Sequence, residues 1–408
     1  MKRIDRISLA AVLLLLVTAT AHADRGHNGQ LRVMTQNLYI GADVTSIIDT
    51  SNVAEIPVRV HDAFSKVDAS NFESRAEAFV EQVRDARPDV IGLQEVSLIR
   101  VQEVSDFMLG NPVLAEEVHK DYLEIVMDEL ADEGLRYEIA GVVTNVDSEL
   151  PAFGALEPGD SPSMYDLRLT DRDVILVRKG IDVSEVMPHN FTFNIYYSTP
   201  LGAITYTRGA IAIKAEIGDH SYRVINTHLE VRFDDEIAIM QAIQMQELLG
   251  LYAGEDLPMI VMGDLNSDPL DTPDTLVGMP TPYQQMLMSG FTDLWEVGGE
   301  GNGFTCCRSE LLDNLDEPLL QRIDYIFVKD GSEDPVFSQS RKTKAYTFVE
   351  VTDEDRWYSD HDGVFAKIKL PRPERRRDHD KHDRENHREH KDHDHKHRGH
   401  RERSDKHD

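Results

Sequence analysis

The feature of this sequence that most constrains its fold is a series of short apolar runs that end in an amide, a carboxylate or an imidazole. Examples are Leu31–Asn37, Asp89–Glu95 and Met259–Met262, the last of which leads into an acidic residue. Runs of this length are typical of buried β-strands. Because functional side chains are commonly placed where rigid elements end, we expect these polar residues to meet in one site. They are Asn37, Glu95, His228, Asp264 with Asn266, Asp324, and Asp360 with His361.

Helical patterns alternate with these strands. Apolar spacing indicates helices over Phe72–Arg87, Leu114–Leu130 and Phe233–Tyr252. The segment Asn145–Asp166 is rich in Pro, Gly, Ser and acidic residues, which predicts a long surface loop. Many strands with few long helices indicate an α/β fold of layered mixed sheets. Further strands are predicted at Asp173–Val177, Phe191–Tyr196, Ala203–Ala215, Tyr222–Asn226, Ile323–Val328, Lys344–Glu350 and Val364–Lys369.

Residues 1–23 have the pattern of a secretory signal peptide. Three basic residues precede the apolar core Ile7–Val17, and Ala21 and Ala23 provide the small residues that a signal peptidase requires. The alternative is a membrane anchor, but so short an apolar run cannot span a hydrocarbon layer that takes about 20 residues. We therefore expect cleavage before Asp24, a secreted or periplasmic protein, and no stable membrane insertion.

The other end of the chain, residues 371–408, is a charged segment that carries nine of the seventeen histidines. It has too few apolar residues to offset the entropy of ordering, so we expect a disordered tail. Such a tract either binds metal ions weakly or is only a solvated extension. Residues 24–370 contain no linker-like segment and are expected to form one domain.

Charge and cysteine content restrict the function further. Each end of the chain carries a net charge of +2, so the total of −31 leaves −35 on residues 24–370. Proteins that bind duplex DNA usually present a basic face, so this charge disfavours a high-affinity nuclease without affecting the chemistry.

The two cysteines, Cys306 and Cys307, are neighbours and are too few for a zinc site. In an oxidising compartment we expect them to form a disulfide, with two free thiols as the alternative.

The polar residues at the strand ends suit a hard cation and proton transfer. Carboxylates and amides without thiolates favour Mg²⁺ or Mn²⁺, which prefer oxygen ligands. Histidines among carboxylates indicate acid–base chemistry, because a carboxylate fixes the imidazole tautomer and stabilises its cation. Each residue taken alone is more often a turn or cap residue, and it is the set that carries the interpretation.

The runs that contain these residues resemble the ordered motifs of the endonuclease/exonuclease/phosphatase family. The resemblance extends from Leu31 to Leu370 and implies a four-layer sandwich, in which two packed β-sheets are flanked by helices. It also implies a metal-dependent hydrolase acting on phosphate esters. The matching runs are Met34–Asn37, Leu93–Glu95, Asn226–Leu229, Gly263–Asn266, Arg322–Tyr325 and Ser359–His361.

The resemblance implies a role for each residue at the expected site. Glu95 would be the principal metal ligand, with Asn37 beside it and Asp360 as a further or water-mediated ligand. Asp264 would orient or deprotonate the attacking water, and Asn266 would hold a phosphate oxygen. His361, paired with Asp324, would be a second acid or base, and His228 would donate to the phosphate or the leaving group. The choice of base between Asp264 and His361 stays open at this point.

Several further residues have two interpretations each. Arg208 lies before His228 and either contacts the substrate phosphate or forms a surface ion pair. Thr305 precedes Cys306 in a loop where the resembling family often places a threonine near the site. Tyr39 and Asp43 closely follow Asn37 and either line the cleft or are structural.

The substrate predicted from the sequence is a phosphate ester, and its class stays open. The motif set favours a nuclease, in which Mg²⁺-assisted in-line attack of water cleaves a nucleic acid. The alternatives are a sphingomyelinase-like lipid phosphodiesterase, for which we find no exposed apolar loop in the sequence, and an inositol-type phosphatase, for which we find no basic cluster. From a different class, the chain would be a binding protein with a decayed site. No protein partner is indicated.

Overall fold

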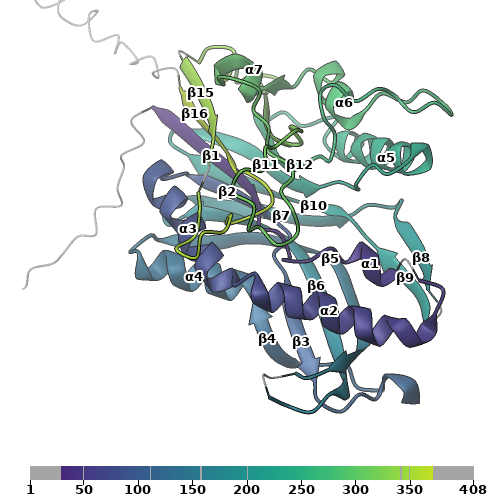
Figure 1. The fold of residues 1–408 in the computed structure, drawn as a ribbon. Coiled ribbons are helices and arrows are strands. Elements are labelled where there is room, and N and C mark those ends of the chain that lie inside the picture. The colour runs from purple at the N-terminus through teal and green to yellow at the C-terminus, as the bar shows by residue number, and fades with distance from the viewer. Residues whose placement is uncertain are drawn as a thin grey trace, which may run out of the picture. The chain divides into compact units, whose positions relative to one another are not determined.

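The computed structural model describes residues 29–370, except residues 49, 111, 157–158, 200, 341 and 349. The predicted signal peptide and the charged tail lie outside the described residues. The described part forms two large mixed β-sheets that pack face to face, with helices on both outer sides (Figure 1). No helix in this part of the chain is long and apolar enough to cross a membrane.

The first sheet has eight strands, and its order is β15-β16-β1-β2-β6-β3-β4, with β5 paired to β6 outside this path. The pair β1–β2 is parallel and the other pairs are antiparallel. The strands are β1 (Gln30–Asn37), β2 (Val90–Gln94), β3 (Leu98–Gln102), β4 (Glu117–Asp121), β5 (Tyr137–Gly154), β6 (Ser163–Arg178), β15 (Lys342–Thr347) and β16 (Val364–Lys369).

The second sheet has six strands in the order β13-β14-β12-β11-β10-β7, and β11–β12 is its parallel pair. A separate two-stranded sheet is formed by β8 (Ile195–Thr199) and β9 (Gly202–Tyr206). The strands of the second sheet are β7 (Asp182–Asn190), β10 (Gly209–Ile217), β11 (His220–His228), β12 (Met259–Asp264), β13 (Thr292–Asp293) and β14 (Asp324–Lys329).

Helices cover the outer faces of both sheets, which gives the four-layer sandwich expected from the sequence. In Figure 1, α3 and α4 lie on the side of the first sheet, and α5 and α6 lie at the upper right, on the second. The helices are α1 (Thr45–Ile48), η1 (Val53–Glu55), α2 (Ile56–Ala69), α3 (Phe72–Ala86), η2 (Phe107–Leu109), α4 (Tyr122–Asp132), α5 (Asp235–Leu251), α6 (Pro282–Met288) and α7 (Leu294–Gly298).

Four apolar cores hold these layers together, one of them between α2 and the β5–β6 hairpin. Between the sheets, Val33 and Val90 of the first pack with Ile213 and Ile260 of the second. One outer core joins α3 and α4 to the first sheet, and the other joins α5 and α6 to the second. Burial of apolar surface on this scale is the main stabilising contribution to a fold of this size.

Four predictions about local structure differ from the structure. The predicted strand Phe191–Tyr196 begins only at Ile195, and Ala203–Ala215 is divided between β9 and β10. The other two concern a loop and a helix. The segment Asn145–Asp166 is not a surface loop, because β5 and β6 form a long hairpin that includes most of it. The hairpin continues because residues such as Leu167, Arg168 and Leu169 alternate between apolar and polar, which is the strand period of two. The predicted helix Leu114–Leu130 begins only at Tyr122, since Asp121 caps its first turn and the residues before it form β4.

Candidate active site

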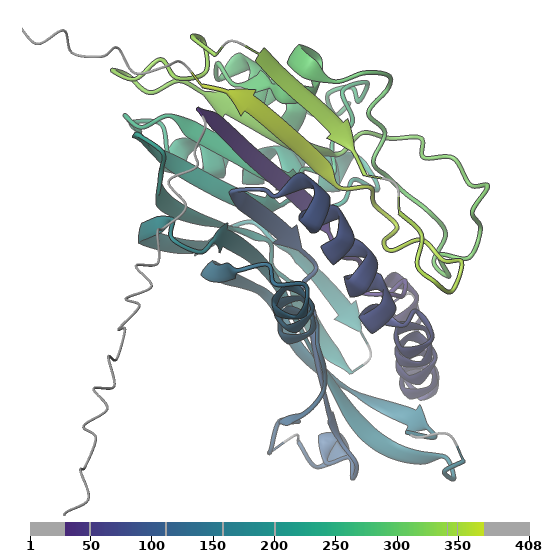
Figure 2. The same cartoon turned by 90° about the vertical axis from the view of Figure 1, so that its left-hand side faces the viewer.

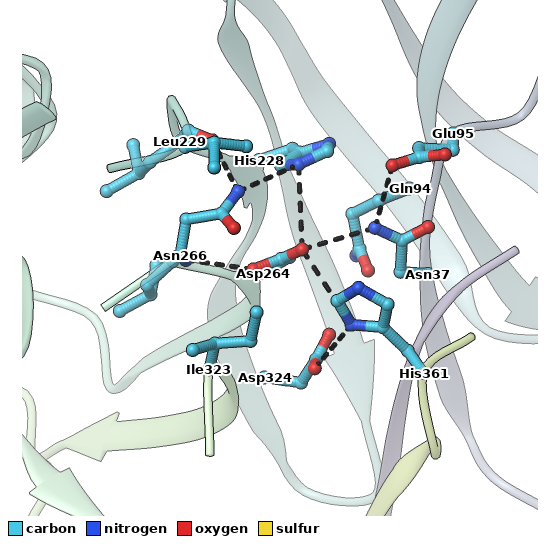
Figure 3. A network of polar contacts seen from close by, with 12 residues as sticks. Asn37, Gln94, Glu95, His228, Leu229, Asp264, Asn266, Ile323, Asp324 and His361 are labelled. Carbon is cyan, nitrogen blue, oxygen red and sulfur yellow. Dashed lines mark hydrogen bonds and ion pairs between the residues drawn. The ribbon is translucent and has the colours of Figure 1, made fainter. Parts of the chain in front are cut away.

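Asp264 is the centre of a network of polar side chains at the ends of several strands (Figure 3). It is the last residue of β12 and is almost fully buried. Its Oδ1 accepts a hydrogen bond of 2.8 Å from the backbone N–H of Asn266, and its Oδ2 accepts one of 3.1 Å from Asn37 Nδ2. His228 Nε2 and His361 Nδ1 lie 3.5 and 3.9 Å from the same Oδ2. One carboxylate therefore links residues from β1, β11, β12 and the segment before β16.

Glu95 lies on the other side of Asn37. Asn37 Nδ2 donates to Glu95 Oε1 over 3.1 Å, and the backbone N–H of Ile40 donates to Oε2 over 2.9 Å. The backbone of Glu95 has a φ of 55°, so the chain turns sharply as it leaves β2. This turn and the two hydrogen bonds hold the carboxylate at the wall of the cavity that Asp360 also lines.

Asp360 and Glu95 concentrate negative charge on this side of the site. Burial raises the pKa of the Asp360 carboxyl to about 6, against a lowering contribution from His361, and the Glu95 carboxylate raises it further. A cation beside these two carboxylates would offset the negative charge that Glu95 imposes on Asp360.

His361 and Asp324 form a close pair. His361 Nδ1 lies 2.8 Å from Asp324 Oδ2, while His361 Nε2 lies 3.9 Å from Asp360 Oδ1. Burial alone would lower the pKa of His361, but the carboxylates of Asp324 and Asp360 raise it well above its usual value. The buried Asp324 Oδ1 forms no hydrogen bond with the described residues. Thr305 Oγ1 accepts from the backbone N–H of Asp324 over 3.2 Å and so fixes the start of β14.

His228 is held in the neutral form, in contrast to His361, whose raised pKa favours the cation. Burial lowers its pKa well below the usual value, and the neighbouring Arg208 and His361 lower it further. Arg208 Nη1 lies 3.1 Å from His228 Nδ1, and Asn266 Nδ2 lies 3.2 Å from His228 Nε2. The structure therefore places a neutral imidazole and a guanidinium side by side at one end of the network.

The pKa of Asp264 is shifted to a value between the lowered pKa of His228 and the raised pKa of His361. Burial and the Asp324 carboxylate raise the pKa of Asp264 to about 7, against the lowering contributions of His361, the Asn266 N–H and the Asn37 amide. A carboxylate with a pKa near the working pH is suited to accept a proton from water. The site thus holds a neutral imidazole, a cationic imidazole and a carboxylate of near-neutral pKa within one network.

All nine residues predicted from the sequence lie in this connected set. Arg208 lies beside His228, lines the cavity and forms a buried ion pair with Glu230 over 3.4 Å, rather than a surface ion pair. Of the two further candidates near Asn37, both Tyr39 and Asp43 line the cavity. Cys306 and Cys307 are joined by a disulfide, in agreement with the sequence-based expectation.

The network opens onto a cavity of about 440 Å³. Its charged lining comprises six carboxylates and two guanidinium groups. Sequence analysis missed four of these eight residues, because Asp171 falls after the segment predicted as a loop, and Glu230, Arg308 and Glu310 belong to no apolar run. The charged residues are Asp43, Glu95, Asp171, Arg208, Glu230, Arg308, Glu310 and Asp360.

The side chains fit a divalent cation. Asp324 Oδ1 is a buried oxygen without a hydrogen-bond donor among the described residues, and ligand atoms of Asp264, Asp324 and His361 lie within 4.8 Å of one another, a set that could hold a cation only if His361 were neutral. The carboxylates of Glu95 and Asp360 face the adjoining cavity. Donor sets made of carboxylates suit hard cations, which bind oxygen.

A fold of two packed sheets with this set of carboxylates, amides and histidines defines a phosphoester hydrolase. Residues 50–361 match the sequence model of the Endonuclease/Exonuclease/phosphatase family. The chain belongs to this family, whose members hydrolyse phosphoesters and generally depend on divalent metals, and it is an enzyme of that kind.

Two relatives and two solved structures illustrate the similarity. The chain is 29% identical over 161 residues to a putative neutral sphingomyelinase of Drosophila melanogaster, and this alignment covers 38% of this chain and 34% of the relative. It is 26% identical over 180 residues to carbon catabolite repressor protein 4 homolog 2 of Arabidopsis thaliana, and this alignment covers 38% of this chain and 28% of the relative. The chain thus matches about a third or less of the length of each relative.

The two structures belong to bacterial proteins. An endonuclease/exonuclease/phosphatase of Beutenbergia cavernae is 21% identical with a TM-score of 0.48, and the alignment covers 84% of this chain and 72% of the other. A mannosyl-6-phosphatase of Bacteroides thetaiotaomicron is 16% identical with a TM-score of 0.47, and the alignment covers 84% of this chain and 100% of the other.

Proposed function

We propose that this protein is an exported, Mg²⁺-dependent phosphodiesterase in which water attacks phosphorus in line with the leaving group. The observation that carries the proposal is the position of Asp264, which contacts both histidines, Asn37 and the backbone of Asn266. Metal-assisted hydrolysis of a phosphoester requires an acceptor for the proton of water, donors for the phosphoryl oxygens and a cation, and this network offers residues for each.

Glu95 and Asp360 would hold the cation, with Asn37 beside them. When bound, Mg²⁺ would neutralise charge on the phosphoryl group and orient it. Asn37 donates to both Glu95 and Asp264 and so fixes the separation between the cation-binding carboxylate and the catalytic carboxylate. Mn²⁺, which also prefers oxygen ligands, is the alternative cation.

Asp264 is assigned as the residue that orients the attacking water and accepts its proton. His361, kept cationic by Asp324 at 2.8 Å, binds a phosphoryl oxygen as a charged donor. Asn266 and His228 lie on the opposite side of Asp264 and donate to the phosphoryl group or the leaving oxygen. Arg208 supplies positive charge beside His228. Such pre-oriented donors in a site shielded from water commonly provide the largest part of the rate enhancement.

Export is part of the proposal. The signal-peptide pattern of residues 1–23 supports it. Activity in the periplasm or outside the cell follows from the same pattern.

Hydrolysis of a simple diester tests the proposal. Purified protein with Mg²⁺ should hydrolyse bis(p-nitrophenyl) phosphate, and EDTA should abolish the reaction. Asp264→Asn should lower the rate by about 10²–10⁴-fold, the usual contribution of a general base. The matched control is Asp313→Asn, which changes an exposed carboxylate and should retain the wild-type rate. Hydrolysis that withstands both EDTA and Asp264→Asn would refute the assignment.

A further inference from the structure

A second cavity, of about 80 Å³, lies between α2 and the β5–β6 hairpin. Val60 and Phe64 of α2 form one wall, and Leu150 and Leu167 of the hairpin form another. Among the lining residues only Ser148 and Tyr206 carry polar side-chain atoms. The volume is several times the roughly 10–15 Å³ that one water needs, but a water there would find few hydrogen-bond partners. The cavity therefore suits an aliphatic group.

This apolar cavity adjoins the catalytic cavity. Five residues line both, and they are Ile40, Val44, Val146, Leu169 and Tyr206. Successive residues of one strand face are two positions apart, and on β6 Leu167 and Leu169 line the apolar cavity whereas Asp171 lines the catalytic one. A substrate whose phosphate lies beside Glu95 and Asp360 in the catalytic cavity can therefore extend an apolar part along the same strand face.

The same hairpin supports an exposed apolar surface at its far end. The side chains of Val104, Met108 and Leu109 are 78%, 75% and 82% exposed, and Val113 and Leu114 in the same connection are also exposed. We call these five residues the apolar tip. In Figures 1 and 2 the β3–β4 connection that bears them lies at the bottom of the view, away from α5, α6 and α7. Soluble proteins rarely leave neighbouring large apolar residues so exposed unless they contact a partner or a lipid surface.

Two buried carboxylates fasten the apolar tip to the hairpin. Asp166 of β6 accepts from Ser105 Oγ over 2.5 Å and from the backbone N–H of Asp106 over 2.8 Å. Glu149 of β5 accepts from the backbone N–H of Ala115 over 2.5 Å. The exposed side chains are thus presented on a defined support at both ends of the connection. Phe153 and Met164, paired at the end of the hairpin, extend the exposed apolar surface.

The charge around the apolar tip indicates what kind of surface it contacts. Residues 103–117 contain four acidic side chains and no lysine or arginine. Anionic membranes attract basic segments, so this composition disfavours them. The six carboxylates of the catalytic cavity likewise disfavour a polyanion such as nucleic acid.

We propose that the substrate is a phosphodiester that carries an aliphatic chain and is presented in a zwitterionic lipid surface. The chain enters the apolar cavity beside the catalytic residues, and the apolar tip contacts the lipid. This inference rests on the proposed phosphodiesterase function and adds a substrate class to it. No exposed apolar loop was expected from the sequence, because short apolar pairs such as Met108–Leu109 and Val113–Leu114 do not reveal their exposure, and the structure shows that these residues are exposed.

Chain-length dependence tests the cavity. The substrates are soluble p-nitrophenyl phosphodiesters whose second substituent is methyl, butyl, hexyl or octyl. In the wild type, kcat/KM should rise by up to about fourfold per buried methylene until the cavity is full. Ala63→Met fills the cavity from α2 and should remove this rise. The matched control is Ala253→Met, which adds the same atoms to a separate apolar cavity beside α5 and should keep the rise.

Vesicle binding tests the apolar tip. The wild type should sediment with phosphatidylcholine vesicles, and Met108→Asp should reduce the bound fraction several-fold. Met288→Asp is the matched control, because Met288 is 76% exposed against 75% for Met108 but lies on α6. The control should bind as the wild type does. These side chains are exposed, so both variants should fold.

The outcomes separate the inference from the function on which it rests. Equal kcat/KM for methyl and octyl esters, no binding to phosphatidylcholine vesicles, or faster turnover of DNA than of the octyl ester would each overturn the inference and leave the phosphodiesterase intact. Failure to hydrolyse any ester, the methyl ester included, would refute the phosphodiesterase function itself.

Discussion

Gln94 and Asn226 join the two sheets directly behind the catalytic residues. Gln94 Nε2 donates to Asn226 Oδ1 over 2.6 Å, and Asn226 Nδ2 donates to the backbone oxygens of Leu93 and Val174 over 2.8 and 3.0 Å. Gln94 immediately precedes Glu95, and Asn226 lies two residues before His228 on β11. This pair therefore fixes the distance between the proposed cation-binding side of the site and the side that binds phosphate.

Asn226→Ala should destabilise the protein and impair the site together. The substitution removes the hydrogen bonds that Asn226 makes to Gln94 and to the buried backbone oxygens of Leu93 and Val174, although Gln94 Nε2 keeps its bond to Thr35 Oγ1. A buried polar group that loses its partner costs about 1–3 kcal/mol. We expect the free energy of unfolding in urea to fall by more than about 2 kcal/mol. The control is Asn302→Ala in an exposed loop. A variant within about 0.5 kcal/mol of the wild type, the range of ordinary surface substitutions, would show that the sheets do not depend on this contact.

The positions of Asn37, Glu95, His228 and Asp264 were predictable because each stands at the end of a buried apolar strand, whereas Asp324 begins β14 and Asp360 and His361 precede β16. Asn37 and Glu95 end neighbouring parallel strands, and His228 and Asp264 end the parallel pair of the other sheet. Strands that are buried on both faces are near-continuous apolar runs, so their ends are visible in the sequence. The family motifs then supplied the order in which these strand ends meet.

The β5–β6 hairpin was not predictable in the same way, because packing overrides its local composition. The residues on one face of the hairpin are buried by α2, a helix that sequence analysis did not identify. Pro151 and Gly154 lie within β5, and both residue types are usually read as breaks in a strand. The cavity residues contributed by the hairpin, above all Asp171, were missed for this reason. A search for alternation across Leu167–Asp171 would have found the strand.

Asp173→Asn should stabilise the protein at neutral and alkaline pH. Asp173 is buried, its Oδ2 accepts from Asn145 Nδ2 over 2.9 Å, and its Oδ1 has no partner among the described residues. Burial and then the Asp171 carboxylate raise the pKa of Asp173 well above its usual value. The folded state therefore favours the protonated form, so the contribution of Asp173 to stability is complete below the unfolded pKa of about 3.9 and is lost as pH rises through the folded pKa.

An asparagine is neutral at every pH and can accept the same hydrogen bond from Asn145. The measurement is the difference in free energy of unfolding between variant and wild type at pH 5 and at pH 8. We expect the variant to gain stability relative to the wild type at the higher pH. A difference that is the same at both pH values would show that the carboxyl is not protonated in the folded state.

Export should produce a chain that begins at Asp24 and whose charged tail is not needed for turnover. The first expectation rests on the signal-peptide pattern, and the second on the position of the tail beyond β16, which ends at Lys369. Intact-mass measurement of the exported protein tests the first, and a mass that includes residues 1–23 would contradict it. A chain that ends at Leu370 should hydrolyse a simple diester at the full-length rate when metal is in excess. Loss of most turnover in a folded truncated protein would assign the tail a role in catalysis.

Metal titration should separate cation binding from proton transfer. Glu95→Gln keeps the shape of the side chain but removes the charge that a hard cation requires, so activity should fall at limiting Mg²⁺. Part of it should return at high Mg²⁺ or Mn²⁺, because mass action offsets a weakened affinity. Asp264→Ala and His361→Ala remove groups that act on water and on the phosphoryl oxygens, so each should lower turnover by about 10²–10⁴-fold at every metal concentration.

The comparison of the three variants decides the roles, because all three residues lie in one network and a general loss of structure would affect them alike. Melting temperatures with and without Mg²⁺ provide the control for folding. Only Glu95→Gln should lose the increase in melting temperature that Mg²⁺ produces, since a ligand stabilises the state that binds it. Wild-type activity of Glu95→Gln at limiting metal would place the cation elsewhere. Recovery of Asp264→Ala in excess metal would make Asp264 a cation ligand, and His361 would then be the remaining candidate for the base.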